Sequence, residues 1–127
     1  MSIVEDTSAS QSDFADLERA RQMDRHYYVI QGAILLYRDN PVRVIDLDGP
    51  NGNVTIKMLS DGNVLNVSRE ELVHSIPKEN DRVRVVFGRL EGHDGQIIGI
   101  DGIEAIVQID GPDKDIHIMN KNLVVTI

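Results

Sequence analysis

The chain has 127 residues, contains no cysteine and carries a net charge of −8 from 21 acidic and 13 basic side chains. The lack of cysteine excludes disulfides, thiolate zinc sites and a cysteine nucleophile. The acidic balance argues against strong, sequence-independent binding to nucleic acid, because lysine and arginine dominate that affinity. No membrane span or signal peptide is visible, which predicts a soluble intracellular protein.

The sequence of the N-terminal region predicts a disordered leader followed by a short helix. Residues 1–11 are small, polar and acidic, as disordered segments are. Residues 12–25 fit an amphipathic helix that packs on the first β unit or on a partner, although a frayed leader explains the same sequence. One face of this helix would carry Phe14, Leu17, Ala20 and Met23.

Residues 28–77 predict a first β unit. Strands are expected at 32–37, 42–47, 54–58 and 65–67, separated by turns rich in Gly, Asn and Asp. Ser68 is expected to cap a single helical turn, with Glu71 three residues further on, and Pro77 ends the unit.

The second unit, residues 78–127, echoes the first. Residues 52–76 and 103–127 align without a gap at an offset of 51. Each unit then has five short strands and one helical turn, which describes a small, strongly bent barrel. The aligned apolar pairs are Ile56/Val107, Met58/Ile109, Leu65/Ile116, Val67/Ile118, Leu72/Leu123 and Ile76/Ile127.

No catalytic or metal-binding pattern is present in the sequence. The four histidines have neither helical pairing nor metal-ligand spacing. Residues 46–57 resemble a calcium loop only at the start, since Pro50, Asn51 and Lys57 replace the expected ligands and glycine. We therefore expect a non-enzymatic protein without a cofactor.

Residues 80–109, NDRVRVVFGRLEGHDGQIIGIDGIEAIVQI, resemble the KOW motif of transcription factors related to bacterial NusG. An alternating strand runs into a loop with Gly92 and Gly95, where the chain is expected to reverse sharply, and a later strand ends in Ile100-Asp101-Gly102. The resemblance is closest to the last pair of KOW domains in the large subunit of the eukaryotic elongation factor DSIF. A splicing protein of the G-patch/KOW type is the alternative.

The resemblance implies a mainly β fold of two tandem SH3-like, five-stranded barrels of the KOW/Tudor type, preceded by the short helix. Its expected parts are residues 1–27, 28–77 and 78–127. It further implies a nuclear, monomeric module that binds RNA polymerase II and elongation-complex proteins. The chain is then either a fragment of the factor or a shorter protein built from the same modules.

A second class of function, binding of single-stranded RNA, needs a basic or aromatic surface. Phe87 follows the core register and is expected to be buried, whereas Val86 and Ile98 lie off that register and are candidates for a seam between the barrels or a partner patch. Acidic neighbours offset the local basic cluster, so composition favours protein contacts over RNA. The candidate contact residues are Arg82, Arg84, Arg89, His93 and Tyr37.

Overall fold

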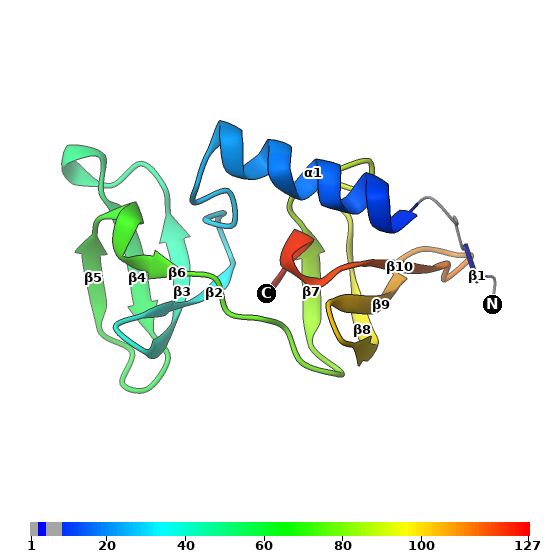
Figure 1. The fold of residues 1–127 in the computed structure, drawn as a ribbon. Coiled ribbons are helices and arrows are strands. Elements are labelled where there is room, and N and C mark those ends of the chain that lie inside the picture. Colours follow the sequence, from blue (N-terminus) through cyan, green and yellow to red (C-terminus); the bar gives the residue numbers. More distant parts are fainter. Residues whose placement is uncertain (1–2, 5–8) are drawn as a thin grey trace.

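The computed structural model describes residues 3–4 and 9–127, and the fold is mainly β with one α-helix among these residues (Figure 1). The helix is α1 (Ala9–Met23), and short 3₁₀ turns are η1 (Pro50–Gly52), η2 (Arg69–Glu71) and η3 (Lys121–Leu123). The strands are β1 (Ile3–Val4), β2 (Ile34–Tyr37), β3 (Asn40–Asp46), β4 (Val54–Met58), β5 (Val64–Val67), β6 (Leu72–Val73), β7 (Arg82–Val85), β8 (Asp94–Asp101), β9 (Glu104–Ile109), β10 (Ile116–Asn120) and β11 (Val124–Thr126).

The described strands form one hydrogen-bonded sheet in the order β1-β10-β9-β8-β7-β11-β2-β3-β4-β5, with β6 attached to β2. Neighbours are antiparallel except β1, which runs parallel to β10. Strands β2–β6 are called the first unit and β7–β11 the second unit. Strand β11 joins them, because Val124 pairs with Val85 of β7 and Thr126 pairs with Ile34 of β2.

Both units contain a β-bulge at the same place. The pairing of β3 with β4 skips Ile45, and the pairing of β8 with β9 skips Ile98. Ile56 of β4 and Val107 of β9 each pair with the residue that directly precedes the bulge, and both are fully buried. They are 51 positions apart, so the predicted repeat holds for β4 and β9. A bulge bends its strand, which helps a small sheet to curl.

After the turns that follow β4 and β9, the predicted ungapped alignment of the two units is wrong by one residue. The turn between β4 and β5 has five residues, whereas the turn between β9 and β10 has six. Leu72 pairs with Tyr37 of β2, and Val124 pairs with Val85 of β7, so Leu72 corresponds to Val124 and not to Leu123. Both Leu72 and Val124 are fully buried.

The two short turns that close the units follow the same offset of 52. The Ser68 side chain accepts a hydrogen bond from the N–H of Glu70, and the Asn120 side chain accepts one from the N–H of Asn122. The predicted cap at Ser68 is therefore present, on a 3₁₀ turn. An oxygen-bearing side chain at each N-cap satisfies a donor that the turn leaves free.

Two hydrophobic clusters lie in the sheet, but the second unit contributes to both. The cluster around Leu35 and Ile56 in the first unit also contains Val86 and Val125 from the second. Val86 thus lies where the units meet, one of the two places that the sequence left open for it, whereas Ile98 is the bulge residue and is 39% exposed. Because buried side chains cross the boundary, the units pack as one body.

Helix α1 packs against β10 and η3 of the second unit, whereas the sequence predicted packing on the first unit or on a partner. Leu17 and Ala20 are buried, as the amphipathic pattern predicts, but Met23 is 78% exposed. Met23, the last residue of the helix, therefore does not join its buried face. The side chain of Phe14 lies outside the described ones.

Strand β1 occupies part of the segment that the sequence predicts to be disordered. Ile3 pairs with Ile116 and Val4 pairs with His117, in parallel. The rest of the leader before α1 lies outside the described residues. The outer edge of β10 is therefore covered by the chain's own N-terminal segment.

Three aromatic side chains after the helix, those of Tyr27, Tyr28 and His74, form hydrogen bonds to main-chain carbonyl oxygens of the two units. The hydroxyl of Tyr27 donates to the carbonyl oxygen of Asn122, and that of Tyr28 donates to Leu72, both at 2.8 Å. The two rings lie edge to face, 5.3 Å apart. A ring N–H of His74 donates to a β11 carbonyl oxygen at 2.8 Å, and burial lowers the pKa of this imidazole. Each of these hydrogen bonds links segments far apart in the sequence.

Candidate protein-binding groove

A groove with a volume of about 510 Å³ lies where the end of α1, the segment leading to β2 and the end of β7 meet. The side chains that line the groove are mostly apolar, and a few of them carry a charge. A groove of this size and lining is typical of sites that bind apolar groups. It is lined by Ala20, Met23, Asp24, Tyr27, Ile30, Gln31, Arg84, Val85, Val86, Phe87, Glu91 and Gly92.

Phe87 lies in the wall of this groove and is not a core residue, so its predicted burial is wrong. Strand β7 ends at Val85, and the N–H of Val86 then donates to the carbonyl oxygen of Leu123 at 2.8 Å. Val85 and Val86 are both buried, although neighbours in a regular strand point to opposite faces. This change of register leaves the ring of Phe87 half-exposed.

Met23 supplies the most exposed apolar side chain of the groove. Methionine is flexible and polarisable, so it adapts to differently shaped apolar partners. Tyr27 and Ile30 stand beside it in the wall and are only partly exposed. Local sequence patterns did not predict this group, because the residues come from the helix end, a connecting segment and a strand end. The one signal in the sequence was a methionine at the end of an amphipathic helix.

Two of the charged groups of the groove already have partners. The Arg84 guanidinium donates to Asp94 at 2.6 and 3.0 Å, and these bonds lower the pKa of the Asp94 carboxyl. Asp24 accepts a bond of 2.5 Å from Arg69. Burial raises the pKa of Asp24, but its hydrogen bonds and the charge of Arg69 outweigh this, so the pKa is lowered. Glu91 is exposed and makes no salt bridge with a described residue.

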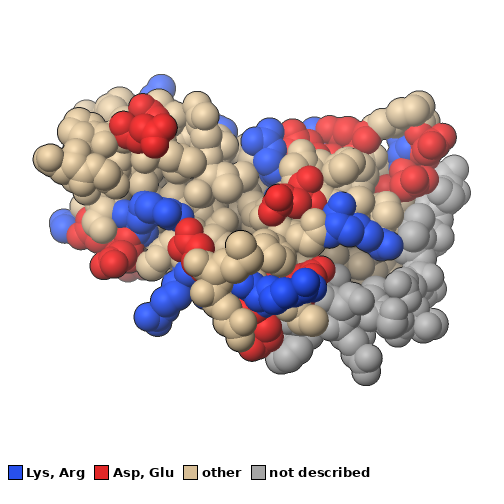
Figure 2. All heavy atoms as spheres, turned by 90° about the horizontal axis from the view of Figure 1, so that it is seen from above, with Lys and Arg blue, Asp and Glu red and all other residues tan. Residues whose placement is uncertain are grey.

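The predicted basic cluster does not form one open cationic surface. Arg82 forms a bidentate ion pair with Asp110, and Arg84 is held by Asp94. Arg89 and His93 are exposed on the loop after β7. Figure 2, the view from above, shows basic and acidic side chains mixed over the face that it presents. The carboxylate in each pair offsets the positive charge that would attract a phosphate.

The two glycines of the predicted motif have different physical roles. Gly92 has φ = +87° and no atom within 4 Å of the place where a Cβ would lie, so the turn needs its backbone freedom. Gly95 instead lies inside β8, where a Cβ would stand 2.5 Å from the carbonyl oxygen of Gln108. Gly95 therefore serves close strand packing.

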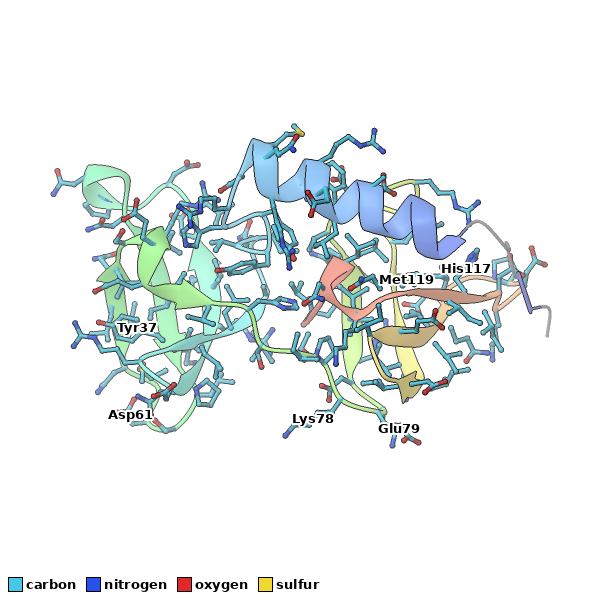
Figure 3. All side chains as sticks on the ribbon, in the orientation of Figure 1. Tyr37, Asp61, Lys78, Glu79, His117 and Met119 are labelled. Atoms are coloured by element: carbon cyan, nitrogen blue, oxygen red, sulfur yellow. The ribbon has the colours of Figure 1, made fainter. Side chains whose placement is uncertain are left out.

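Tyr37 is separate from the other candidate residues. It lies on β2 in the first unit, far from the end of the molecule where His117 is labelled (Figure 3). Its ring is half-buried against the first-unit cluster, and the Arg38 guanidinium lies 5.1 Å from the ring centroid. Tyr37 does not join the groove.

A second, smaller hollow of about 220 Å³ lies beside the turn after β9 and contains His93 and His117. Burial lowers the pKa of His117, and the nearby charge of Arg89 acts in the same direction.

Among the described residues, no group of three or more His, Cys, Asp and Glu side chains is arranged to hold a metal ion. In this part of the chain, no helix is long and apolar enough to span a membrane.

Sequence comparisons agree with the fold. Residues 76–124 match the family described as the seventh KOW domain of transcription elongation factor SPT5. Over 87 residues the chain is 33% identical to the putative transcription elongation factor SPT5 homolog 1 of Arabidopsis thaliana, a match that covers 68% of this chain and 8% of that protein.

The β fold, the glycine loop and these matches define a KOW-type domain of a transcription elongation factor. The matches support a KOW domain of the SPT5/DSIF family in this chain. The resemblance read from residues 80–109 is thereby confirmed. The chain spans only a small part of the relative's length.

Proposed function

We propose that this chain is a non-catalytic binding module that acts in the nucleus and docks on RNA polymerase II or its associated proteins during elongation. The match of residues 76–124 to an elongation-factor family supports the setting, and the groove supports the mode of contact. The strongest single observation is that the groove presents Met23 and Phe87 beside Arg84, which is already paired with Asp94. Such a surface suits an apolar protein segment better than a phosphate backbone.

The proposal includes two tandem SH3-like barrels at residues 28–77 and 78–127. The repeated strand order and the two hydrophobic clusters support this division. Because Val86 and Val125 of the second barrel pack in the first cluster, the pair presents the groove on one rigid support.

The proposal is tested by biolayer interferometry of the full chain on an immobilised RNA polymerase II elongation complex. We expect Met23→Glu to weaken binding at least about ten-fold, because it places a charge in an apolar contact. The matched control is Ile103→Glu, an aliphatic residue that is 62% exposed and does not line the groove. Equal losses in both variants, or none in either, would remove the groove from the proposal.

Salt dependence separates this proposal from RNA binding. Protein contacts through the groove should change affinity less than about ten-fold between 50 and 200 mM salt, whereas a protein that neutralises several phosphates loses far more. RNA binding remains the second candidate because Arg89 and His93 are exposed on one loop. It predicts an anisotropy signal with single-stranded RNA that disappears when Arg82, Arg84 and Arg89 are reversed to Glu.

A further inference from the structure

The outer strands of the two units, β5 and β10, differ in whether a further described strand covers their outer edge. Val64 of β5 lies opposite Lys57, and Ile116 of β10 lies opposite Gln108. Lys57 and Gln108 are 51 positions apart, so Val64 and Ile116 hold equivalent places. Strand β1 covers the outer edge of β10, whereas β5 ends the sheet and no described strand pairs with its outer edge (Figure 1).

The free edge of β5 has backbone groups in the orientation that β1 uses on β10. The N–H of Met58 donates to the carbonyl oxygen of Asn63 at 2.8 Å. Hydrogen-bonded and non-hydrogen-bonded pairs alternate along an antiparallel ladder. The N–H and C=O groups of Val64 and Asn66 therefore point away from β4. The same alternation, counted from the bond of Ile109 N–H to the Asp115 carbonyl oxygen (2.9 Å), turns the backbone of Ile116 outward, toward β1.

The side chains along this edge are apolar and exposed. Val64 is 60% exposed and Leu65 is 41% exposed, whereas Ile116, the equivalent of Val64, is only 5% exposed. Strand β5 has the sequence Val-Leu-Asn-Val, without the charged residues or proline that usually prevent edge pairing. The edge thus combines free backbone groups with an apolar surface.

A positive charge marks the end of the edge where β5 begins. Lys57 is exposed, and its Cε lies 3.9 Å from the position of a Cβ at Gly62, in the turn before β5. Lys57 makes no salt bridge with a described residue. The nearby carboxylate of Asp61 accepts hydrogen bonds from the main chain and side chain of Asn63. An incoming carboxylate would therefore find Lys57 unpaired.

We propose that the outer edge of β5 binds an extended segment of a partner protein as an added parallel strand. The segment has two consecutive aliphatic residues, preceded by an acidic residue that pairs with Lys57. The parallel direction follows β1 on β10, and it places the start of the segment beside the start of β5. Strand addition at a free edge supplies main-chain hydrogen bonds, and the side chains add selectivity. This surface is separate from the groove, so it does not depend on the function proposed above.

The test is an NMR titration of the full ¹⁵N-labelled chain with the peptide acetyl-Ser-Glu-Ile-Val-Thr-Ser-amide. We expect the amide signals of Val64 and Asn66 to shift, and their hydrogen exchange to slow at least ten-fold near saturation. The amide of Ile116 should not change, because β1 already covers that edge. The same peptide with proline in place of isoleucine should not bind, because it lacks the N–H that the ladder needs.

Variants separate the backbone and charge parts of the proposal. Lys57→Glu should weaken peptide binding at least five-fold, whereas Lys78→Glu, an exposed lysine on the segment between the units, should leave it unchanged. A peptide with lysine in place of glutamate should bind correspondingly more weakly to the unchanged chain. No shift of Val64 or Asn66 at about 1 mM peptide, or equal binding of the proline peptide, would overturn the proposal.

Discussion

Replacing Gly95 by alanine should open the contact between β8 and β9 and destabilise the fold. A Cβ at this position would stand 2.5 Å from the carbonyl oxygen of Gln108 and 3.0 Å from Cγ1 of Val107. A carbon–oxygen contact normally needs about 3.3 Å, so the oxygen must move by roughly 0.8 Å. Antiparallel strands are held about 4.8 Å apart by their hydrogen bonds, and such a movement disturbs the ladder.

The magnitude follows from these contacts. Overpacking of a well-packed site costs about 1–3 kcal/mol, and one weakened main-chain hydrogen bond adds about 1 kcal/mol. We therefore expect Gly95→Ala to lower the free energy of unfolding by about 2–4 kcal/mol. For a chain of this length that corresponds to a fall in Tm of roughly 10 °C.

The assay is urea and thermal unfolding followed by far-UV circular dichroism, with Gly92→Ala as the matched control. Gly92 has φ = +87° but open space around it, so its substitution adds only backbone strain of about 1 kcal/mol. Gly95→Ala must be the more damaging change. If it unfolds like the wild type, or less easily than Gly92→Ala, the argument from strand packing is refuted.

Two further predictions concern contacts between the units, and a third concerns the hydrogen bond of Tyr28 to the first unit. Burial lowers the pKa of His74, so on acidification the unfolded chain binds a proton near pH 6.5, before the folded chain does. The free energy of unfolding should therefore fall as the pH drops from about 7 toward the folded pKa. His74→Asn should flatten this slope in urea titrations at several pH values. Val125→Ala should remove about 1–3 kcal/mol and lower one common unfolding transition, because Val125 is buried in the first-unit cluster; separate transitions measured by calorimetry would contradict this. Tyr28→Phe should remove about 1 kcal/mol with its hydrogen bond to Leu72, as measured by the urea midpoint, and an unchanged midpoint would show that water replaces that bond.

The sequence alone determined the β character, the position of the helix before the main strands and the KOW resemblance. Alternation of apolar residues and turns rich in Gly, Asn and Asp are local signals, and they predicted β4 and β9 with the correct repeat. The cap at Ser68 was also readable, because a capping side chain acts within two or three residues. The KOW resemblance rested on the same kind of short-range pattern.

Tertiary structure decided where these elements meet. One extra residue in the turn before β10 shifts the repeat, and only the strand register shows that Leu72 corresponds to Val124. Arg82 pairs with Asp110, 28 positions away, through the approach of β7 to the turn after β9. The groove at Phe87 arises from a local change of register at the end of β7. Such contacts depend on which strands become neighbours, a long-range outcome of packing that local sequence patterns do not encode.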